Sequence, residues 1–298
     1  MSRLFYIVCI AMLPLAVIAQ EESHLDSLRR ERRDAVMERI DELRPKYNAD
    51  SVRAEIESGS YFTLYKDNYF IGGTAIGDKL MAANSNVKFQ LSISQRLTRS
   101  RLPFDTYLYI QFTQKTIWNV LEESMPMYDM NFNPGIGLGH LIVYRNKYVG
   151  NAYMMIEHES NGKDGELSRS WNKVSFGGRF LLSKYVDTHV KTWIPIIDSD
   201  NNRDILSYNG LAEVTFNYHP PNKRMIFSLT STWRSRSFSF NTQWEMSFKT
   251  TRNDNQYFFI QYYNGYGECL LDYNKYKSML RIGFVIKPDG FNLFRGLP

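Results

Sequence analysis

The chain has 298 residues and a formal net charge of +5, which is too modest to suggest nucleic-acid binding. Of its two cysteines, Cys9 lies in a segment typical of a cleaved leader, so Cys269 is left alone. A disulfide framework within the chain and a zinc site built on cysteine are therefore both excluded. After the leader, no segment approaches the ~18 unbroken apolar residues that a membrane helix needs. A soluble all-β protein and a membrane β-barrel are the two classes to separate.

Residues 1–19 predict a secretory signal peptide. Arg3 stands before an apolar run over residues 4–18, and Ala19 provides a small residue at the cleavage site. The run is too short and ends too sharply for a permanent membrane anchor. A buried N-terminal helix is the less favoured alternative. The mature chain is therefore expected to begin at Gln20 and to be exported.

A highly charged segment over residues 20–60 follows the leader. Its apolar residues recur at roughly helical spacing until Pro45 interrupts the pattern. We interpret it as a solvated, helical periplasmic extension in front of the main domain at residues 61–298. A helix that binds a partner is the alternative. The spaced apolar residues are Leu25, Leu28, Val36, Ile40 and Leu43.

From Tyr61 onward the hydrophobic period changes from helical to two. Segments of about ten residues alternate in this way and are separated by Asn, Asp, Gly and Lys clusters, as in strands with one polar and one apolar face. Roughly ten to twelve of them fit between Asn68 and Lys287. Three examples of apolar faces are Phe238, Phe240, Trp244, Met246 and Phe248; Thr106, Leu108 and Ile110; and Leu280, Ile282, Phe284 and Ile286.

These segments favour a membrane barrel over a soluble sandwich. Each is long enough to cross a bilayer when tilted, and the aromatic residues gather near the segment ends, as in an interfacial girdle. Closure is also the only way in which a sheet satisfies all its backbone groups inside lipid. The predicted fold class is therefore all-β: a transmembrane antiparallel β-barrel of about twelve strands with a short helical N-terminal extension.

One hairpin carries polar residues where the barrel pattern requires lipid-facing ones. His158 and Ser160 continue the parity of Ile156, because side chains two residues apart in a strand lie on one side. Asn172 shares the parity of the apolar residues on the returning strand. A pore lining would place its polar groups on the opposite face. The three polar residues are therefore predicted on the outside of the barrel wall.

The three side chains suit nucleophilic catalysis. The two-residue offset places the His158 imidazole near enough to the Ser160 hydroxyl for proton abstraction, and Asn172 can hold the other ring nitrogen. An amide costs less than a carboxylate beside hydrocarbon, but it supports an imidazolium less. A cation bound by the oxygen-rich loop from Lys163 to Ser168 can compensate by polarising the carbonyl under attack. By itself, a His-x-Ser pair is a weak signal.

Two runs of residues in this hairpin resemble a known family, the outer-membrane phospholipases A. His-Glu-Ser-Asn-Gly at 158–162 is followed by Ser-Arg-Ser-Trp-Asn at 168–172, and the combination at this spacing is specific. Shorter stretches extend the resemblance over most of the chain from Phe62 to Ile286. They include residues 62–65, 87–91, 113–115, 122–124 and 265–268.

The resemblance implies a twelve-stranded barrel of the bacterial outer membrane that hydrolyses acyl esters of phospholipids in the outer leaflet. Phospholipase A1, phospholipase A2 and lysophospholipase activities are all implied. By motif position, Ser160 matches the nucleophile and His158 the base. Asn172 matches the orienting residue, and the Gly162 backbone N–H matches part of the oxyanion hole.

The resemblance also implies a Ca2+ cofactor and a homodimer. The Ser168 hydroxyl and the Lys163 carbonyl match calcium ligands, although an Arg is usual at the lysine position. The Ser124 carbonyl matches a ligand that the second subunit supplies. Gln114 matches an interface glutamine, and its parity is that of Ile110, on the lipid-facing side where an unpaired amide is costly.

Two alternatives from other classes stay open at this point. One is a passive outer-membrane pore, which is the default for a barrel pattern alone and predicts ion conductance and indifference to Ser160→Ala. The other is a catalytically silent structural barrel, which predicts a folded chain with no turnover at any calcium level.

Overall fold

The computed structural model falls into two units, residues 1–44 and 45–298, and each is described by itself. None of the helices among the described residues combines the length and the apolar character needed to span a membrane. The predicted signal peptide at 1–19 lies outside the described residues. Those described are 25–39, 42–77, 79, 81–196, 200–235, 239–251 and 255–287.

In the first unit, residues 25–39 are helical, as their apolar spacing predicts. Leu28 and Val36 are exposed on this helix. Ile40, which belongs to the same apolar pattern, is outside the described residues. The helical prediction is thus confirmed over residues 25–39.

The second unit begins with helix α2 (Ala49–Ser58) before the sheet starts. The Asn48 side chain caps its first turn by accepting hydrogen bonds from the N–H groups of residues 50 and 51. At its other end, the Arg96 guanidinium donates to the carbonyls of Ile56 and Glu57. Val52 and Ile56 are buried against a cluster of inward-facing tyrosines of the barrel. The helix is therefore part of the same unit as the barrel, although the sequence pattern assigns it to the extension.

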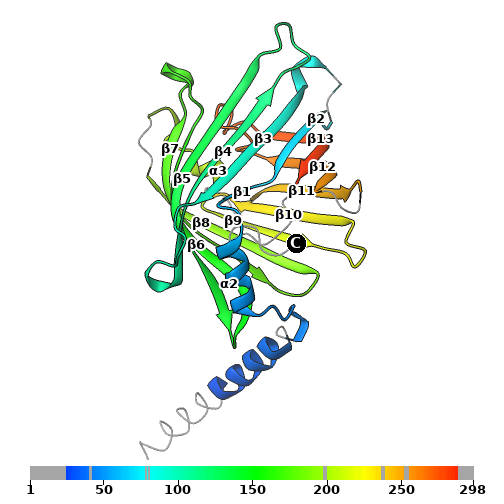
Figure 1. Cartoon of the computed structure of the whole chain (residues 1–298). Coiled ribbons are helices and arrows are strands. Elements are labelled where there is room, and N and C mark those ends of the chain that lie inside the picture. Colours follow the sequence, from blue (N-terminus) through cyan, green and yellow to red (C-terminus); the bar gives the residue numbers. More distant parts are fainter. Residues whose placement is uncertain are drawn as a thin grey trace, which may run out of the picture. The chain divides into compact units, whose positions relative to one another are not determined.

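The strands pair antiparallel in chain order and close into a ring (Figure 1). β13 pairs with β2, and β3 pairs with both β2 and β4, so the twelve strands from β2 to β13 have no open edge. The two-residue β1 adds to the far end of β3. The strands are β1 (Phe62–Thr63), β2 (Asn68–Ala75), β3 (Ser85–Arg96), β4 (Thr106–Trp118), β5 (Met127–Tyr144), β6 (Lys147–Ser160), β7 (Ser170–Leu181), β8 (Val186–Ile196), β9 (Ala212–Tyr218), β10 (Met225–Trp233), β11 (Phe240–Lys249), β12 (Gln256–Gly265) and β13 (Lys277–Ile286). The remaining short helices are η1 (Ala82–Asn84), η2 (Pro103–Asp105), η3 (Gly165–Leu167), η4 (Asp200–Asn202) and α3 (Leu206–Asn209).

The barrel has an apolar outer face and a polar inner face, as the alternation predicts. Ile282 and Phe284 on β13 are more than half exposed, whereas Arg281, the residue directly before Ile282, is 1% exposed. On β11, Trp244 faces outward in the same way. Phe238, assigned to that strand from the sequence, lies outside the described residues. A soluble protein has its apolar side chains inside and its polar ones outside. The opposite arrangement is expected of a barrel surrounded by hydrocarbon.

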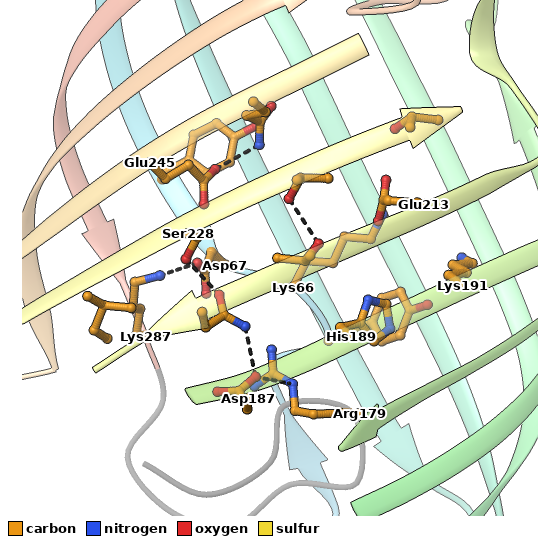
Figure 2. Close-up of a pocket in the computed structure, with 18 of the residues that line it drawn as sticks. Lys66, Asp67, Arg179, Asp187, His189, Lys191, Glu213, Ser228, Glu245 and Lys287 are labelled. Atoms are coloured by element: carbon orange, nitrogen blue, oxygen red, sulfur yellow. Dashed lines mark hydrogen bonds and ion pairs between the residues drawn. The ribbon is translucent and has the colours of Figure 1, made fainter. Parts of the chain in front are cut away.

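Charged side chains inside the barrel pair with one another. Glu268, in the loop between β12 and β13, lies 3.2 Å from Lys88 Nζ and 2.5 Å from Arg281 Nη1. Burial by itself raises the pKa of Glu268, but the adjacent Arg281 and Lys88 bring it down to about 2. Figure 2 shows another such pair, Arg179 and Asp187 on β7 and β8. A cavity of about 990 Å³ lies among these inner side chains.

The two ends of the barrel differ in their loops. The end that we call the motif end carries the loops at 119–126, 161–169 and 266–276, the last of which we call the plug loop. Buried side chains from loops and strands pack together inside the barrel at this end: Trp171, Trp193, Ile205, Leu270 and Tyr273. Helix α2 lies at the opposite end, where the Ala49 N–H donates to the carbonyl of Asn146 in the β5–β6 turn.

The buried pairing predicts a large stability loss on removal of one partner. Arg281→Met leaves Glu268 with Lys88 alone and is expected to lower the free energy of unfolding by about 3 kcal/mol. Urea unfolding in detergent, followed by tryptophan fluorescence, measures this. Arg101→Ala is the control, because Arg101 pairs with Glu57 and Asp105 at an exposed position and should cost less than about 1 kcal/mol. Equal losses in the two variants contradict the prediction.

Candidate functional site

The predicted base and its orienting residue lie on the outer wall of the barrel. His158 on β6 and Asn172 on β7 are directly opposite each other in the ladder, and His158 Nδ1 is 2.8 Å from Asn172 Oδ1. Ile156, on the same face, is 59% exposed, whereas Glu157 is 1% exposed. A hydrogen-bonded polar pair therefore stands on the apolar outer face, as the parity predicts.

Ser160 ends β6 on the same face as His158. The ladder pairs it with Ser170 on β7 and with Phe132 on β5. Within the described residues, no hydrogen bond joins its hydroxyl to the His158 imidazole, which bonds to Asn172 instead. Without substrate, such contacts are often long and tighten only when the reactant binds. The structure thus gathers the three residues on one face of one hairpin.

The loop at 161–169 is organised by Asn161, a residue to which the sequence analysis assigns no role. Its side chain is 1% exposed. It donates to the Leu167 carbonyl at 2.9 Å and accepts from the Arg169 N–H at 2.9 Å, which ties the two ends of the loop together. In the sequence, the position of Asn161 directly after Ser160 was the one feature that could have indicated a role. The role itself depends on contacts with Leu167 and Arg169, which only the folded loop brings together.

Gly162 adopts a conformation that favours glycine. Its φ is +63°, and a Cβ at this position would lie 3.0 Å from a ring carbon of Phe132. Among the described residues its N–H donates to no acceptor. A free backbone donor therefore stands two residues after Ser160, at the outer wall.

Two of the predicted calcium ligands belong to the same loop. The Lys163 carbonyl and the Ser168 hydroxyl accept no hydrogen bond from the described residues, while Lys163 Nζ donates to the Tyr128 carbonyl at 2.9 Å. In the described part of the chain, no three His, Cys, Asp or Glu side chains gather as a metal site. The two oxygens predicted as ligands are a carbonyl and a hydroxyl, which calcium accepts.

Ser124, the third predicted ligand, lies in a different loop. It is exposed in the turn at 119–126, at the motif end, with φ +65°. Its loop joins β4 to β5, whereas Lys163 and Ser168 lie between β6 and β7. The structure therefore places Ser124 at the same end of the barrel but outside the loop that carries the other two ligands.

Gln114 lies in the same row of the outer wall as Ser160. The ladder pairs Gln114 on β4 with Phe132 on β5, and Phe132 with Ser160 on β6. Two strand spacings correspond to about 10 Å. Gln114 is half-buried and its side chain donates to the Thr116 hydroxyl. Its outward parity is confirmed, and it stands close to the candidate nucleophile.

The inner cavity and the remaining cysteine are separate from the candidate site. The cavity is lined by inward-facing side chains, whereas His158, Ser160 and Asn172 lie on the other side of the wall. Cys269 is buried in the plug loop, and burial raises the pKa of its thiol to about 12, which suppresses the nucleophilic thiolate. The three candidate catalytic residues therefore lie outside the cavity and apart from the buried thiol.

Comparisons with known proteins agree with this location. Residues 61–286 match the family model described as Phospholipase A1. The phospholipase A1 of Escherichia coli K12 is 29% identical over 304 residues, which cover 92% of this chain and 94% of the relative. The enzyme of Salmonella typhimurium LT2 is 28% identical with the same coverage.

Solved structures show the same barrel. Outer membrane phospholipase A from Escherichia coli superposes with a TM-score of 0.68 at 25% identity, covering 76% of this chain and 98% of that one. The outer membrane phospholipase of Salmonella typhi, described as a dimer with bound calcium, gives a TM-score of 0.69 at 25% identity. It covers 82% of this chain and 98% of its own.

These matches set aside the passive pore as the main interpretation. The family model spans most of the described barrel, and the relatives align over nearly their whole length. The twelve-stranded ring with its apolar outer face agrees with a multi-pass protein of the bacterial outer membrane. The chain belongs to the phospholipase A1 family, a family of carboxylic ester hydrolases.

Proposed function

We propose that the chain hydrolyses acyl esters of phospholipids through a Ser160–His158–Asn172 triad on its outer wall. The observation that carries the proposal is the 2.8 Å contact between His158 Nδ1 and Asn172 Oδ1. An amide oxygen accepts a hydrogen bond, so Nδ1 is the nitrogen that carries the proton, and in the neutral imidazole Nε2 is then the nitrogen that can act as a base. The outward position supports a substrate that approaches from the surrounding lipid.

The chemistry follows from these positions. Ser160 Oγ attacks the acyl carbonyl carbon and gives its proton to His158 Nε2. The oxygen of the tetrahedral intermediate takes a hydrogen bond from the Gly162 N–H, and the intermediate then expels the alkoxide of the lysophospholipid, which takes the proton from His158. Water then attacks the acyl-enzyme and gives a proton to His158 Nε2. The second tetrahedral intermediate expels Ser160 Oγ, which takes that proton back, and the fatty acid is released.

We further propose calcium as the cofactor. The free Lys163 carbonyl and Ser168 hydroxyl fit a hard cation, and the related Salmonella typhi phospholipase has been described with bound calcium. When bound, calcium supplies positive charge next to the developing oxyanion. Two ligands are too few for its shell of six to eight oxygens. The carbonyl of the partner subunit's Ser124 is proposed as another ligand.

The homodimer is proposed from the position of Gln114 on the outer wall. An amide facing hydrocarbon gains from a partner on a second barrel. Since Gln114 lies in the same row as Ser160, such an interface would run beside the site. Monomers are then folded but nearly inactive, because neither completes the calcium shell alone.

The orientation in the membrane belongs to the same proposal. The motif end, which carries the loop at 161–169, faces the outer leaflet, and α2 faces the periplasm. Residues 1–19 are removed as a signal peptide, and the charged segment at 20–60 lies in the periplasm. Substrates are phospholipids cleaved at either acyl position, together with lysophospholipids.

Ser160→Ala and His158→Ala are each expected to abolish fatty-acid release, because they remove the nucleophile and the base. Asn172→Ala is expected to keep a residual rate, tens-fold or more below wild type, since only the orientation of the base is lost. Fatty-acid release from mixed micelles measures all three. Ser170→Ala, opposite Ser160 in the ladder, is the matched control and should retain activity. A shift in electrophoretic mobility on heating checks folding, and near-normal turnover of Ser160→Ala contradicts the triad.

Calcium removal is expected to stop turnover, and Ser168→Ala is expected to raise the calcium concentration that gives half-maximal activity. The reason is that one oxygen ligand is lost while the others stay. Isothermal titration calorimetry measures calcium binding, and fatty-acid release measures the response. Full activity in excess chelator, without detectable calcium binding, would sink the calcium assignment.

Dilution in detergent is expected to lower specific activity as dimers dissociate. Gln114→Ala should shift this dilution curve to higher protein concentration by an amount near the ~1 kcal/mol typical of membrane hydrogen bonds. Chemical crosslinking gives the dimer fraction at each point. Constant specific activity down to concentrations with only monomer rules out a shared site.

A further inference from the structure

A chain of contacts connects the loop at 161–169 with the plug loop on the inside of the barrel. Lys163 Nζ donates to the Tyr128 carbonyl at 2.9 Å, and the Tyr128 hydroxyl donates to Asp272 Oδ2 at 2.6 Å. Lys163 belongs to the first loop, Tyr128 to the start of β5, and Asp272 to the plug loop. Three segments that are far apart in the sequence therefore meet at the motif end.

Tyr128 is the extra residue of a β-bulge and has no partner in the register of β4 and β5. On β4, Ile117 pairs with Asp129 and Trp118 pairs with Met127, so Tyr128 is the extra residue on β5. The ladder between β5 and β6 begins only at Phe132. A bulged residue is free to point its carbonyl away from the sheet. The Tyr128 carbonyl is thus available to Lys163. The hydrogen bond from the Tyr128 hydroxyl to Asp272 restrains the position of Tyr128.

Asp272 is a well-fixed acceptor. Its side chain is 6% exposed, and it also pairs with Lys275 Nζ at 2.9 Å and with Lys277 Nζ at 3.5 Å. Burial by itself raises the pKa of Asp272, but the hydrogen bond from Tyr128 and the charge of Lys275 hold the pKa below its ordinary value. The carboxylate therefore stays ionised at neutral pH and gives the tyrosine a strong acceptor.

The plug loop is itself fastened to β5 next to the bulge. The Leu270 N–H donates to the Asn131 side chain at 3.0 Å, and the Leu271 N–H donates to Asp129 at 2.9 Å. Both acceptor side chains are almost completely buried. The plug loop and the beginning of β5 thus form one hydrogen-bonded support on the inside of the wall, against which Lys163 rests.

We propose that Tyr128 and Asp272 are positioning residues of the phospholipase site: by holding the Lys163 side chain, they fix the Gly162–Lys163 segment that carries the oxyanion donor and a calcium-binding carbonyl. The inference rests on the proposed function and adds that residues inside the barrel determine the position of a loop at the outer site. Gly162 has no side chain and adopts a left-handed φ, so its own conformation is weakly restrained. The tethered neighbour supplies the restraint that Gly162 lacks.

The test compares two variants that remove or weaken the hydrogen bond between Tyr128 and Asp272, called the cutting variants, with one that leaves it intact. Tyr128→Phe removes only the hydroxyl, and Asp272→Asn weakens its acceptor. Lys275→Gln is the matched control, because it removes another partner of Asp272 and leaves the contact with Tyr128. All three are compared with wild type after the mobility shift on heating has established that the barrel is folded.

Hydrogen–deuterium exchange of residues 161–169 in calcium-free protein is the first readout, and it does not depend on catalysis. Tyr128→Phe and Asp272→Asn are expected to speed exchange there by roughly three- to tenfold, the effect of losing one hydrogen bond. The double variant should exchange no faster than either single one, because both cut the same connection. Lys275→Gln should match wild type.

Calcium-dependent fatty-acid release is the second readout. The two cutting variants should need roughly three- to tenfold more calcium for half-maximal activity. Their kcat at saturating calcium should be close to wild type, because an ion bound to the Lys163 carbonyl would then hold the Gly162–Lys163 segment in place of the lost contact. Wild-type exchange and calcium response in folded Tyr128→Phe overturn the inference, as does an equal effect in Lys275→Gln. If Ser160→Ala proves active, the proposed triad fails, while the exchange experiment still decides whether the support exists.

Discussion

The structure depends on the need to pair every backbone N–H and C=O group where water is absent. In hydrocarbon an open sheet edge leaves polar groups without partners, so a sheet is stable there only when it is closed. Here the pairing of β3 with β4 completes the ring that begins with β2 and β13. Closure then divides the chain into an outward and an inward set of side chains. The apolar set faces the lipid and the charged set fills the interior.

The candidate site lies on the outer wall of the closed ring and not in the cavity inside it. The cavity inside the barrel is lined by paired charges and is separated from lipid by the wall. His158, Ser160 and Asn172 are on the lipid side of the wall, from which the substrate approaches in the proposed function. An amide partner for the imidazole suits this environment, since a lone carboxylate beside hydrocarbon is heavily penalised. The weaker support of the imidazolium is offset, in the proposed function, by calcium.

The interior nevertheless contributes to the outer site. At the motif end the plug loop is fastened to β5 and, through Asp272 and Tyr128, reaches the loop that follows Ser160. Asn161 closes that loop from within. Buried hydrogen bonds of this kind restrain the segments that they join. The wall therefore carries the candidate catalytic residues on its outer side, while the hydrogen bonds that reach their loop come from its inner side.

The sequence alone determined which residues face outward, because the side-chain period of a strand is two and does not depend on the neighbouring strands. It therefore put Ile282, Trp244 and Ser160 on the lipid side, and its motifs pointed to His158 and Asn172. What it could not determine was any contact whose partners are distant along the chain. The register that sets Gln114 in the row of Ser160, the bulge at Tyr128 and its bond to Asp272 all depend on closure of the ring and on the packing of the loops. The packing of α2 on the barrel could not be predicted for the same reason. The helix lies within the segment predicted to be a solvated helical extension, and only the folded barrel brings Val52 and Ile56 into a buried cluster with its tyrosines.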